Sequence, residues 1–501
     1  MLEDLQVIKR DGSRQDFSIT KIADSVWAAA EAVGGDCYEL SEDIAETVAD
    51  RIDELTDEAD MNEISVELIQ TLVQKELIED GHAKTATCYI LKSAERMRAR
   101  EEDSPMMRAI KEATFVDSGD SEMKRENANI DSETAMGTML KYGSEAAKLF
   151  NISNMMSEEY SELHSNGDIH AHDLDFYTLT ETCAQIDILA LFKNGFNTGH
   201  GFLREPGNIR TAGALAAIII QSNQNDQHGG QAIPMFDFYL APYVALTFTK
   251  RVGDAAKKCM RLTKEQRSEI VNEIKNFRET TERKLLLNQA GLGAVEAILQ
   301  DKLTEFEVSF NEEDIRYIMN EANDDTYDET YQSMEAFIHN LNTMHSRAGS
   351  QVPFSSINYG TDTSTEGRMI MRALLENTDA GLGNGEIPIF PIQIWKMKAG
   401  VSINPGDPNY DLFRLACKVS AKRLYPNWCN LDAPYNAAIY VDGKPETEMA
   451  YMGCRTRIST NLHDPNQEIL PGRGNLSFTS INLPRIAIIA DKDIDKFFAI
   501  L

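Results

Sequence analysis

The stretch VIKRDGSRQDFSITKI, residues 7–22, sets the fold of the first part of the chain. At its centre is Asp11-Gly12, a dipeptide favoured in tight turns between two strands. Short runs that suit β-strands stand on both sides of this dipeptide. We therefore expect a β-hairpin over residues 5–17.

Helical patterns follow the hairpin. The first helix is expected to begin near Lys21, with Ser18 or Thr20 as the capping residue, because a side-chain oxygen there accepts from the first backbone amides. A hairpin with four helices makes one small domain, to which we assign residues 1–97. The four helices are expected from Lys21 to Gly34-Gly35 and at about 41–55, 64–80 and 84–100.

Basic residues gather at the start of an acidic protein. The chain has 80 acidic and 49 basic residues and a formal charge of −31, which argues against general affinity for nucleic acid. Against that background Lys9, Arg10, Arg14 and Lys21 form a basic cluster. Cations beside a helix N-terminus favour phosphate groups, so the cluster predicts a bound anion; the alternative is a solubilising surface.

Length and composition indicate an ordinary globular protein. With 501 residues and 42% apolar residues, the chain can form two to four domains. Its longest apolar run, residues 213–220, is too short to span a bilayer, and no secretory signal is visible, so we expect a cytoplasmic protein without membrane partners. The seven cysteines include no C-x-x-C pair, which argues against a disulfide framework or a zinc ribbon.

The rest of the chain is predicted to form a linker and an α/β domain. Residues 98–127 are polar and aperiodic, as in a linker. Over 128–501, helical stretches alternate with strand-like runs such as 387–395 and 437–441, which predicts parallel strands. Residues 486–489 also read as a strand before a final, short helix. Because domains seldom end within an element whose apolar face is still unburied, we expect a fragment or one half of a split protein.

Two short motifs contain residue types that carry chemistry. Cys454, in YMGCRTRIST (451–460), has no cysteine near it in sequence, and Gly453 lets the backbone bend and approach a ligand. In HAHD, His170 and His172 share one side of a strand. This spacing is common and implies no distant ligands, so no metal site is predicted.

The first part of the chain resembles an ATP-cone, the regulatory domain of ribonucleotide reductases and of their transcriptional repressor. The resemblance rests on VIKRDGSRQDFSITKI, SVWAAA, ISVELIQTLVQKELIEDGH and CYILKSAER. One departure is Thr87, where the family usually has a lysine, which removes one phosphate contact. The residues that the resemblance implies for binding ATP or dATP are Val7, Ile8, Lys9, Arg10, Gly12, Lys21 and His82.

From residue 126 onward the chain resembles the anaerobic, class III ribonucleoside-triphosphate reductases. The motifs include GDIHAHDLDFYTLTETCAQID (167–187), SRAGSQVPFSSINYG (346–360), MGCRTR (452–457) and GRGNLSFTSINLPRIAI (472–488). The resemblance implies a ten-stranded α/β barrel, here incomplete, with a central finger loop. A barrel would also exclude water from a radical.

The resemblance assigns roles to individual residues. Cys454 would become a thiyl radical that removes the 3′-hydrogen of the ribose, and Cys183 would donate hydrogen from the opposite face. Asn475 would be the active-site asparagine of the formate-dependent subgroup, with Asn482 as the alternative. Weaker candidates for contact with the substrate are His172, Arg455, Ser355 and Ser356.

The family also implies cofactors and partners. These are ribonucleoside triphosphates as substrates, ATP and dATP as effectors, formate as reductant, and a radical-SAM iron–sulfur activating enzyme. The neighbourhood of residues 211–231 would form a homodimer interface and a second effector site, although a buried helix and a loop explain its composition equally well. A glycyl-radical loop and a structural zinc site are expected in a further C-terminal segment, or in a separate polypeptide.

The sequence leaves three hypotheses about function. We expect these 501 residues alone to bind ATP or dATP without turnover, and the missing segment with the activating enzyme to restore deoxynucleotide production. The first alternative is a different glycyl-radical enzyme, similar to pyruvate formate-lyase. The second is a non-catalytic, dimerising fragment that senses nucleotides.

Overall fold

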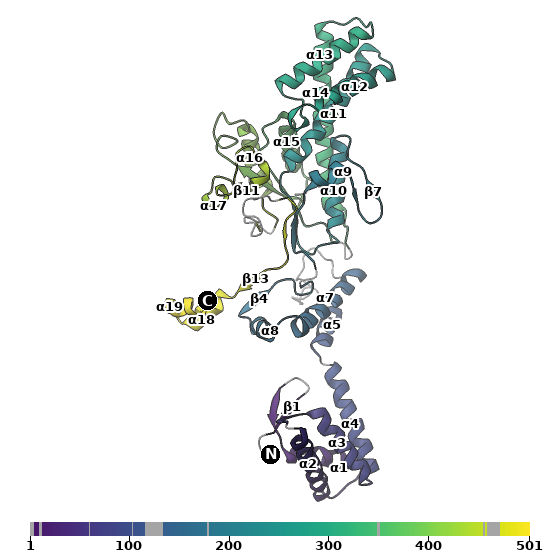
Figure 1. Cartoon of the computed structure of the whole chain (residues 1–501), viewed down its shortest axis with the longest axis vertical. Coiled ribbons are helices and arrows are strands. Elements are labelled where there is room, and N and C mark those ends of the chain that lie inside the picture. Colours follow the sequence, from purple (N-terminus) through teal and green to yellow (C-terminus); the bar gives the residue numbers. More distant parts are fainter. Residues whose placement is uncertain are drawn as a thin grey trace. The chain divides into compact units, whose positions relative to one another are not determined.

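The structure is a computed structural model of the whole chain (Figure 1). It separates into two compact units, Met1–Glu112 and Ala113–Leu501, and each is described by itself. The described residues are 5–9, 13–59, 61–102, 104–115, 134–177, 180–347, 351–453, 456–457 and 471–501.

The N-terminal unit contains the predicted hairpin and four helices. Strand β1 pairs antiparallel with β2, as expected, and also pairs parallel with a third strand, β3, which sequence reasoning missed. Three residues are too few to show a strand pattern. The elements are β1 (Gln6–Ile8), β2 (Arg14–Asp16), α1 (Ile19–Glu31), α2 (Glu39–Ala59), β3 (Glu63–Ser65), α3 (Val66–Glu79) and α4 (Ala83–Glu102).

The helix ends of this unit show which capping expectation holds. Ser18 is the N-cap residue of α1, but its side chain makes no capping hydrogen bond. Ser65 caps α3 in the ordinary way, because its hydroxyl accepts from the backbone amide of Leu68 at 3.2 Å. Apolar residues of α1 to α4, including Val48 and Val73, close the core of the unit beneath β1.

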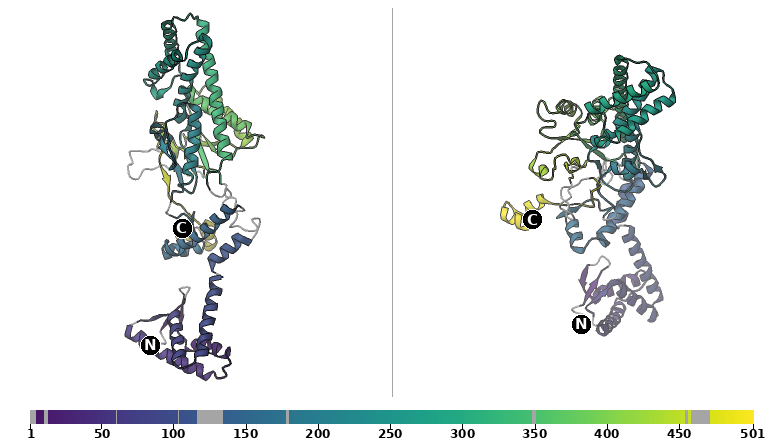
Figure 2. Two further views of the ribbon diagram at one scale, coloured as in Figure 1. Left: turned by 90° about the vertical axis from the view of Figure 1, so that its right-hand side faces the viewer. Right: turned by 45° about the horizontal axis from the view of Figure 1, so that its top comes forward.

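The second unit is built on a six-stranded sheet of order β11-β10-β9-β8-β5-β12 (Figures 1 and 2). The first five strands of this order are parallel, and β12 is antiparallel to β5. The strands are β5 (Cys183–Gln185), β8 (Gln231–Ile233), β9 (Ser355–Tyr359), β10 (Ile392–Met397), β11 (Asn427–Asn430) and β12 (Gly474–Asn475).

Helices cover one face of this sheet. The long helices α11 and α14 lie side by side there, with α12 and α13 packed together near their far ends (Figures 1 and 2). Ile357, Tyr359 and Trp395 point from the sheet into this main core. The helices of this layer are α10 (Ile209–Asn223), α11 (Phe236–Met260), α12 (Lys264–Arg278), α13 (Gln289–Glu305), α14 (Glu312–Thr343), α15 (Thr365–Ala380) and α16 (Tyr410–Arg423).

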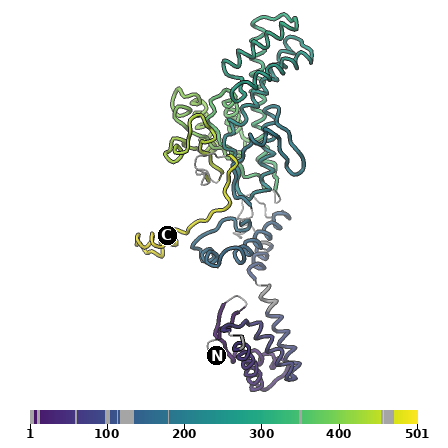
Figure 3. Tube along the Cα trace, viewed as in Figure 1, coloured from purple at the N-terminus to yellow at the C-terminus, as the bar shows by residue number. Residues whose placement is uncertain are grey.

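A smaller layer stands beside the sheet. It contains a two-stranded pairing of β4 with β13, and Figure 3 shows the extended trace that leads from the sheet to the C-terminal helices. A second pairing joins β6 to β7. The elements of this layer are α7 (Ala135–Asn154), α8 (Glu158–Ser165), β4 (Ile169–Ala171), β13 (Thr479–Ile481), α18 (Leu483–Ala490) and α19 (Ile494–Ile500). Elsewhere in the unit are α9 (Ile188–Asn194), β6 (Phe196–Asn197), β7 (Phe202–Leu203) and α17 (Pro434–Ala437), and α5 (Pro105–Phe115) spans the boundary between the two units.

Several expectations about local structure are wrong. Residues 486–489 are not a strand but part of α18, because Asn482 caps the helix and Pro484 suits its first turn. Residues 437–441 form no strand; they leave α17 in turns. The expected linker is not irregular throughout, since α4 continues to Glu102 and α5 follows it.

Other expectations stay predictions. The described residues show the six-stranded sheet, and closure into a ten-stranded barrel remains a prediction, as do the domain boundaries after residues 97 and 127. Within the described part, no helix combines the length and apolar character needed to cross a membrane. The apolar run at 213–220 lies in α10, where α11 and α14 of the same chain cover it.

Candidate functional site

The structure brings Cys183 and Asn475 together from distant parts of the chain. They are direct partners in the antiparallel pairing of β5 with β12. The backbone amide of Thr182 donates to the Asn475 carbonyl at 2.9 Å. Gly474 is needed beside them, because a Cβ there would lie 2.4 Å from the Cys183 carbonyl oxygen. The Cys183 side chain is only 2% exposed, in a small cluster with Ala232 and Met452.

Residues 448–453, which we call the stem, lie on the sheet face opposite the helices. The Lys396 ammonium bonds the Glu448 carboxylate at 2.6 Å, and Met449 packs with Ile394. Further along, Met452 meets Cys183. The chain that leads to Cys454 therefore lies on the same face as Cys183. Cys454 and Arg455 themselves are outside the described residues.

Gly453, at the end of the stem, is packed closely. A Cβ at this position would lie 2.8 Å from the ring of Phe354 and 3.0 Å from the side chain of Ile392. Phe354 immediately precedes β9, and Ile392 is the first residue of β10. The glycine thus allows a close approach to the sheet, one of the two roles expected for it from the sequence.

A group of buried charges lies beneath the start of the stem. Lys396 is fully buried, and its partner Glu448 also accepts a hydrogen bond from the Thr361 hydroxyl at 2.6 Å. Nearby, burial raises the pKa of Asp237 to about 6; Lys396 opposes this rise and Asp362 adds to it. Buried charges of this kind persist only when they are paired and hydrogen-bonded.

Two buried acceptors near Cys183 have no hydrogen-bond partner among the described residues. They are Oδ1 of Asn475 and Oε1 of Gln185. Gln185 lies two residues beyond Cys183 on β5, and its amide nitrogen reaches the Ala450 carbonyl of the stem at 3.4 Å. Because an unsatisfied buried acceptor is costly, these oxygens suit a bound molecule that carries hydroxyl groups.

A cavity of about 640 Å³, which we call the histidine pocket, lies between α7, β4 and the loop at 172–176. The described residues Lys141, Lys148 and Arg347 supply its cations, against the carboxylates of Asp173 and Asp175. Lys148 is paired with Glu145 at 3.1 Å, and Arg347 donates to the backbone carbonyls of Gln224 and Gln227, so the charges of this pocket do not by themselves select a ligand. Its lining includes His164, His170, His172 and His228.

The histidines of this pocket are held in place by specific contacts. His172 stacks on Phe478 with 4.1 Å between ring centroids, and its Nε2 lies 2.7 Å from the Ser480 hydroxyl. His228 stacks on Phe176 at 4.9 Å and shares a 2.7 Å hydrogen bond with Thr180. Burial lowers the pKa of His172 and of His228, so both favour the neutral imidazole.

The pocket and Cys183 share neighbouring segments. The backbone amide of His228 donates to the Glu181 carbonyl at 3.0 Å, two residues before Cys183. On the other side, β13 pairs with β4 only a few residues after Asn475. Two parts of the pocket lining, His228 and β4, are therefore bonded to segments that lead to Cys183 and Asn475.

The two predicted serines lie on opposite faces of β9. Ser356 shares the face of Asn358, which contacts the stem, and its hydroxyl donates to the Gln231 carbonyl at 3.2 Å. Ser355 points to the other face and donates to the Pro353 carbonyl at 3.1 Å. Since strand side chains alternate, only Ser356 shares the face of Cys183.

The predicted effector residues of the N-terminal unit are placed as follows. Lys9 is exposed directly after β1, and Lys21 is exposed in the first turn of α1. Val7 packs against the core, and its neighbour Ile8 is half-buried. His82 stands before α4 with Nε2 3.7 Å from Asp80. Arg10 and Gly12 lie outside the described residues.

Thr87 is the residue at which the N-terminal unit departs from the family pattern. Its hydroxyl donates to the Ala83 carbonyl of its own helix at 2.8 Å. A side chain held against the helix backbone does not reach outward as a lysine would. The consequence of Thr87 for nucleotide binding stays a prediction.

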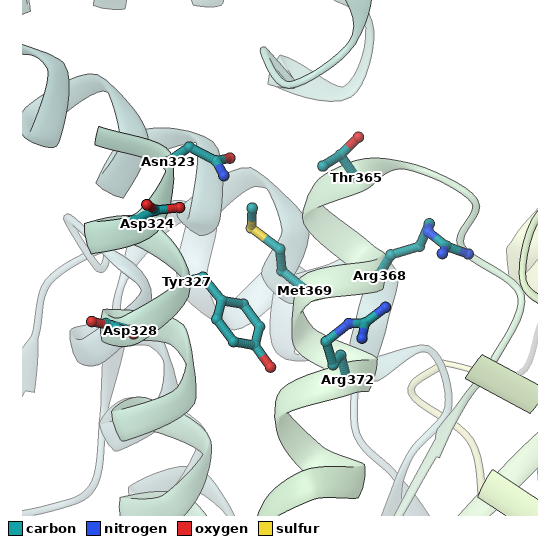
Figure 4. A pocket seen from close by; sticks show the side chains of 8 residues that line it. All are labelled: Asn323, Asp324, Tyr327, Asp328, Thr365, Arg368, Met369 and Arg372. Carbon is teal, nitrogen blue, oxygen red and sulfur yellow. The ribbon is translucent and has the colours of Figure 1, made fainter. Parts of the chain in front are cut away.

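A second cavity, of about 600 Å³, lies between α14 and α15 (Figure 4). Its two arginines and its tyrosine are engaged in the protein. Arg368 and Arg372 bond Asp411 at 2.8 and 3.2 Å, and the Tyr327 hydroxyl donates to Glu376 at 2.6 Å. We assign no part of the site to it.

Sequence reasoning missed the residues that hold the stem and line the pocket. They are Gln185, His228, Arg347, Asn358, Lys396 and Glu448. A signal was present for Lys396, because it is the one charged residue of the largely buried strand β10.

Comparisons with known proteins cover both units. The ATP cone domain family matches residues 5–98, and the anaerobic ribonucleoside-triphosphate reductase family matches residues 126–501. Proteins of that reductase name from Haemophilus influenzae and Escherichia coli are 28% and 27% identical to this chain, over 98% and 99% of it. The chain spans 60% of the length of each.

A phage protein and a solved structure are also similar. The reductase of enterobacteria phage T4 is 30% identical over 67% of this chain and 46% of its own length. The Thermotoga maritima anaerobic ribonucleotide reductase, solved with dATP and CTP, aligns with 82% of this chain and 59% of its own, at 12% identity and a TM-score of 0.44. From the family match over residues 126–501, the chain belongs to the anaerobic ribonucleoside-triphosphate reductases and carries an N-terminal ATP-cone.

Proposed function

We propose that this protein reduces ribonucleoside triphosphates to deoxyribonucleoside triphosphates, with Cys454 and Cys183 on either side of the ribose. The observation that carries the proposal is the path of the stem. It crosses the sheet face that presents Cys183, and Met452 packs against that cysteine only two residues before Cys454. Family membership supplies the class of reaction.

The site chemistry follows from the placement of these groups. The Cys454 sulfur removes the 3′-hydrogen from one side of the sugar. Cys183, on the other side, donates hydrogen as the 2′-hydroxyl leaves as water. The family's glycyl radical, when present, supplies the oxidising equivalent to Cys454. The Cys454 sulfur then returns the hydrogen to C3′. Overall, formate gives up two electrons and a proton and leaves as carbon dioxide, and a second proton comes from solvent, so each deoxynucleotide consumes one formate and releases one water.

Polar residues bind and orient the nucleotide in this proposal. The unpartnered oxygens of Asn475 and Gln185 accept hydrogen bonds from the sugar hydroxyls. The phosphates lie toward the histidine pocket, whose wall includes His172. The sheet and the stem keep water from the sulfur atoms, which a radical site requires.

Control and partners belong to the same proposal. ATP or dATP binds the N-terminal unit at Lys9 and Lys21. A radical-SAM iron–sulfur enzyme activates the protein, formate is the reductant, and the enzyme works as a homodimer in the cytoplasm. Support comes from the family matches and from the exposed positions of the two lysines.

The test is deoxynucleotide production under anaerobic conditions. The chain is incubated with CTP, ATP and formate, alone and together with an activating enzyme and a glycyl-radical polypeptide. We expect dCTP in the complemented reaction and none after Cys454→Ser or Cys183→Ser. Cys417→Ser, an exposed cysteine on α16, is the matched control and should retain turnover. Turnover that persists in Cys454→Ser would refute the proposal.

A further inference from the structure

Asn358 lies at the middle of the face that the stem crosses. It is fully buried, and it makes two hydrogen bonds to the backbone of Tyr451. The Tyr451 amide donates to Oδ1 at 2.9 Å, and Nδ2 donates to the Tyr451 carbonyl, also at 2.9 Å. One side-chain amide thus satisfies both backbone groups of a single residue, as a neighbouring strand would.

Tyr451 belongs to a short pairing on both sides of Cys454. Tyr451 is bridged antiparallel to Arg457, and the Met452 amide donates to the Thr456 carbonyl at 3.0 Å. The second limb has its own anchor, since Arg457 donates to Asn436 Oδ1 at 3.0 Å. Residues on either side of Cys454 are therefore fixed to each other, and Asn358 fixes the first limb to the sheet.

We propose that Asn358 is a positioning residue for Cys454, which it sets relative to Cys183 by holding the backbone of Tyr451. This inference rests on the proposed function for its consequence in turnover. Both polar atoms of the Asn358 side chain are engaged by backbone groups, Oδ1 with the Tyr451 amide and Nδ2 with the Tyr451 carbonyl. Its amide is suited to this task because it combines one donor and one acceptor in a plane; aspartate lacks the donor, and leucine lacks both.

The consequence of losing these bonds follows from burial. Without them, the amide and carbonyl of Tyr451 would be buried without partners, which favours states in which the stem leaves the sheet. Two ordinary hydrogen bonds correspond to about a 30-fold change in such an opening equilibrium. Neighbouring contacts at Glu448 and Met452 remain, so the opening is local.

The test measures how fast iodoacetamide alkylates Cys454 in the folded full chain. Mass spectrometry of the Cys454 peptide gives the rate, and Cys429 is an internal reference, because burial raises the pKa of its thiol to about 12. We expect Asn358→Leu to raise the Cys454 rate about 30-fold. An unchanged rate in a folded Asn358→Leu protein would overturn the proposal.

A matched control separates positioning from general stability. Asn377 is also buried, and its amide donates to the Tyr331 and Ala373 carbonyls on the helix side of the sheet, at 3.1 and 2.9 Å. Asn377→Leu should lower the melting temperature as Asn358→Leu does, while the Cys454 rate stays at the wild-type value. An equal rise in both variants would overturn the proposal.

Asn358→Asp gives a rescue that depends on pH. The ionised carboxylate faces the Tyr451 carbonyl without a donor, whereas the protonated acid restores it. The ratio of variant to wild-type Cys454 alkylation rates should therefore be high at alkaline pH and approach one as pH falls. A ratio that does not change with pH would overturn the proposal. This test applies even if Asn358→Leu does not fold.

Turnover distinguishes this inference from the proposed function. In the activated enzyme, Asn358→Asp should lower kcat and leave KM for CTP unchanged, because the nucleotide contacts are intact. If Cys454→Ser retains turnover while the alkylation results hold, the proposed function fails and the positioning stands. If Cys454→Ser abolishes turnover and the alkylation rates do not change, only the positioning fails.

Discussion

The buried pair of Lys396 and Glu448 should contribute strongly to the stability of the second unit. Lys396 is fully buried, the Glu448 side chain is 7% exposed, and 2.6 Å separates their charged atoms, so solvent screens the pair little. Removing one partner of such a pair costs about 3–5 kcal/mol, because the other charge stays buried without compensation. We expect Lys396→Met to lie at the upper end of this range, since it leaves both Glu448 and Asp237 without the cation.

A double-mutant cycle tests this magnitude. Glu448→Gln should cost less than Lys396→Met, and the double variant should cost clearly less than the sum, with a coupling of about 2 kcal/mol or more. Urea unfolding followed by tryptophan fluorescence reports on the sheet, because Trp395 and Trp428 are in adjacent strands and Trp27→Phe removes the signal of the other unit.

A surface pair close by provides the control. Lys398 bonds Asp432 at 3.2 Å, with side chains 21% and 36% exposed. Lys398→Met should therefore cost below about 1 kcal/mol. The reasoning is refuted if Lys396→Met costs no more than Lys398→Met, or if the two substitutions of the buried pair are additive.

Three further predictions concern other parts of the molecule. Lys21→Ala should weaken ATP binding about tenfold in calorimetry, as expected for one charged contact, while Lys75→Ala on the exposed side of α3 should not; equal affinities would contradict the assigned site. Because burial lowers the pKa of His228, the unfolded state binds more protons near pH 6, and the melting temperature should fall as pH drops from 7.5 to about 5.5. His228→Gln should reduce this fall, and an unchanged pH profile would contradict the cause. Gly453→Ala should destabilise the stem through contact with the Phe354 ring, and Phe354→Leu should relieve it; no rescue would argue against that contact.

The N-terminal unit was largely predictable because its signals are local. Asp11-Gly12 predicts the hairpin, and the helix patterns that follow it are regular. The order of strands and helices therefore follows from short stretches of sequence. The third strand was missed because Glu63–Ser65 is short and is defined by its pairing with β1. Pairing between distant segments carries no local signal.

In the second unit, the resemblance supplied Cys183 and Asn475, but not the way in which they meet. Their pairing across β5 and β12 depends on the path of the whole chain. Lys396 stands out in sequence as a charge within an apolar strand, and yet its partner Glu448 could not be named, because only the course of the stem brings them together. The mistaken strand at 486–489 has a different cause: apolar composition was given more weight than the cap at Asn482.

Chemical cross-linking of Cys454 to Cys183 tests the central claim most directly. Dibromobimane joins two thiols only when they are a few ångströms apart, and mass spectrometry identifies the joined peptides. We expect a 183–454 product in the folded chain, absent after Cys454→Ser or Cys183→Ser. Cys454 found singly labelled, or joined to a different cysteine such as Cys429, would contradict it.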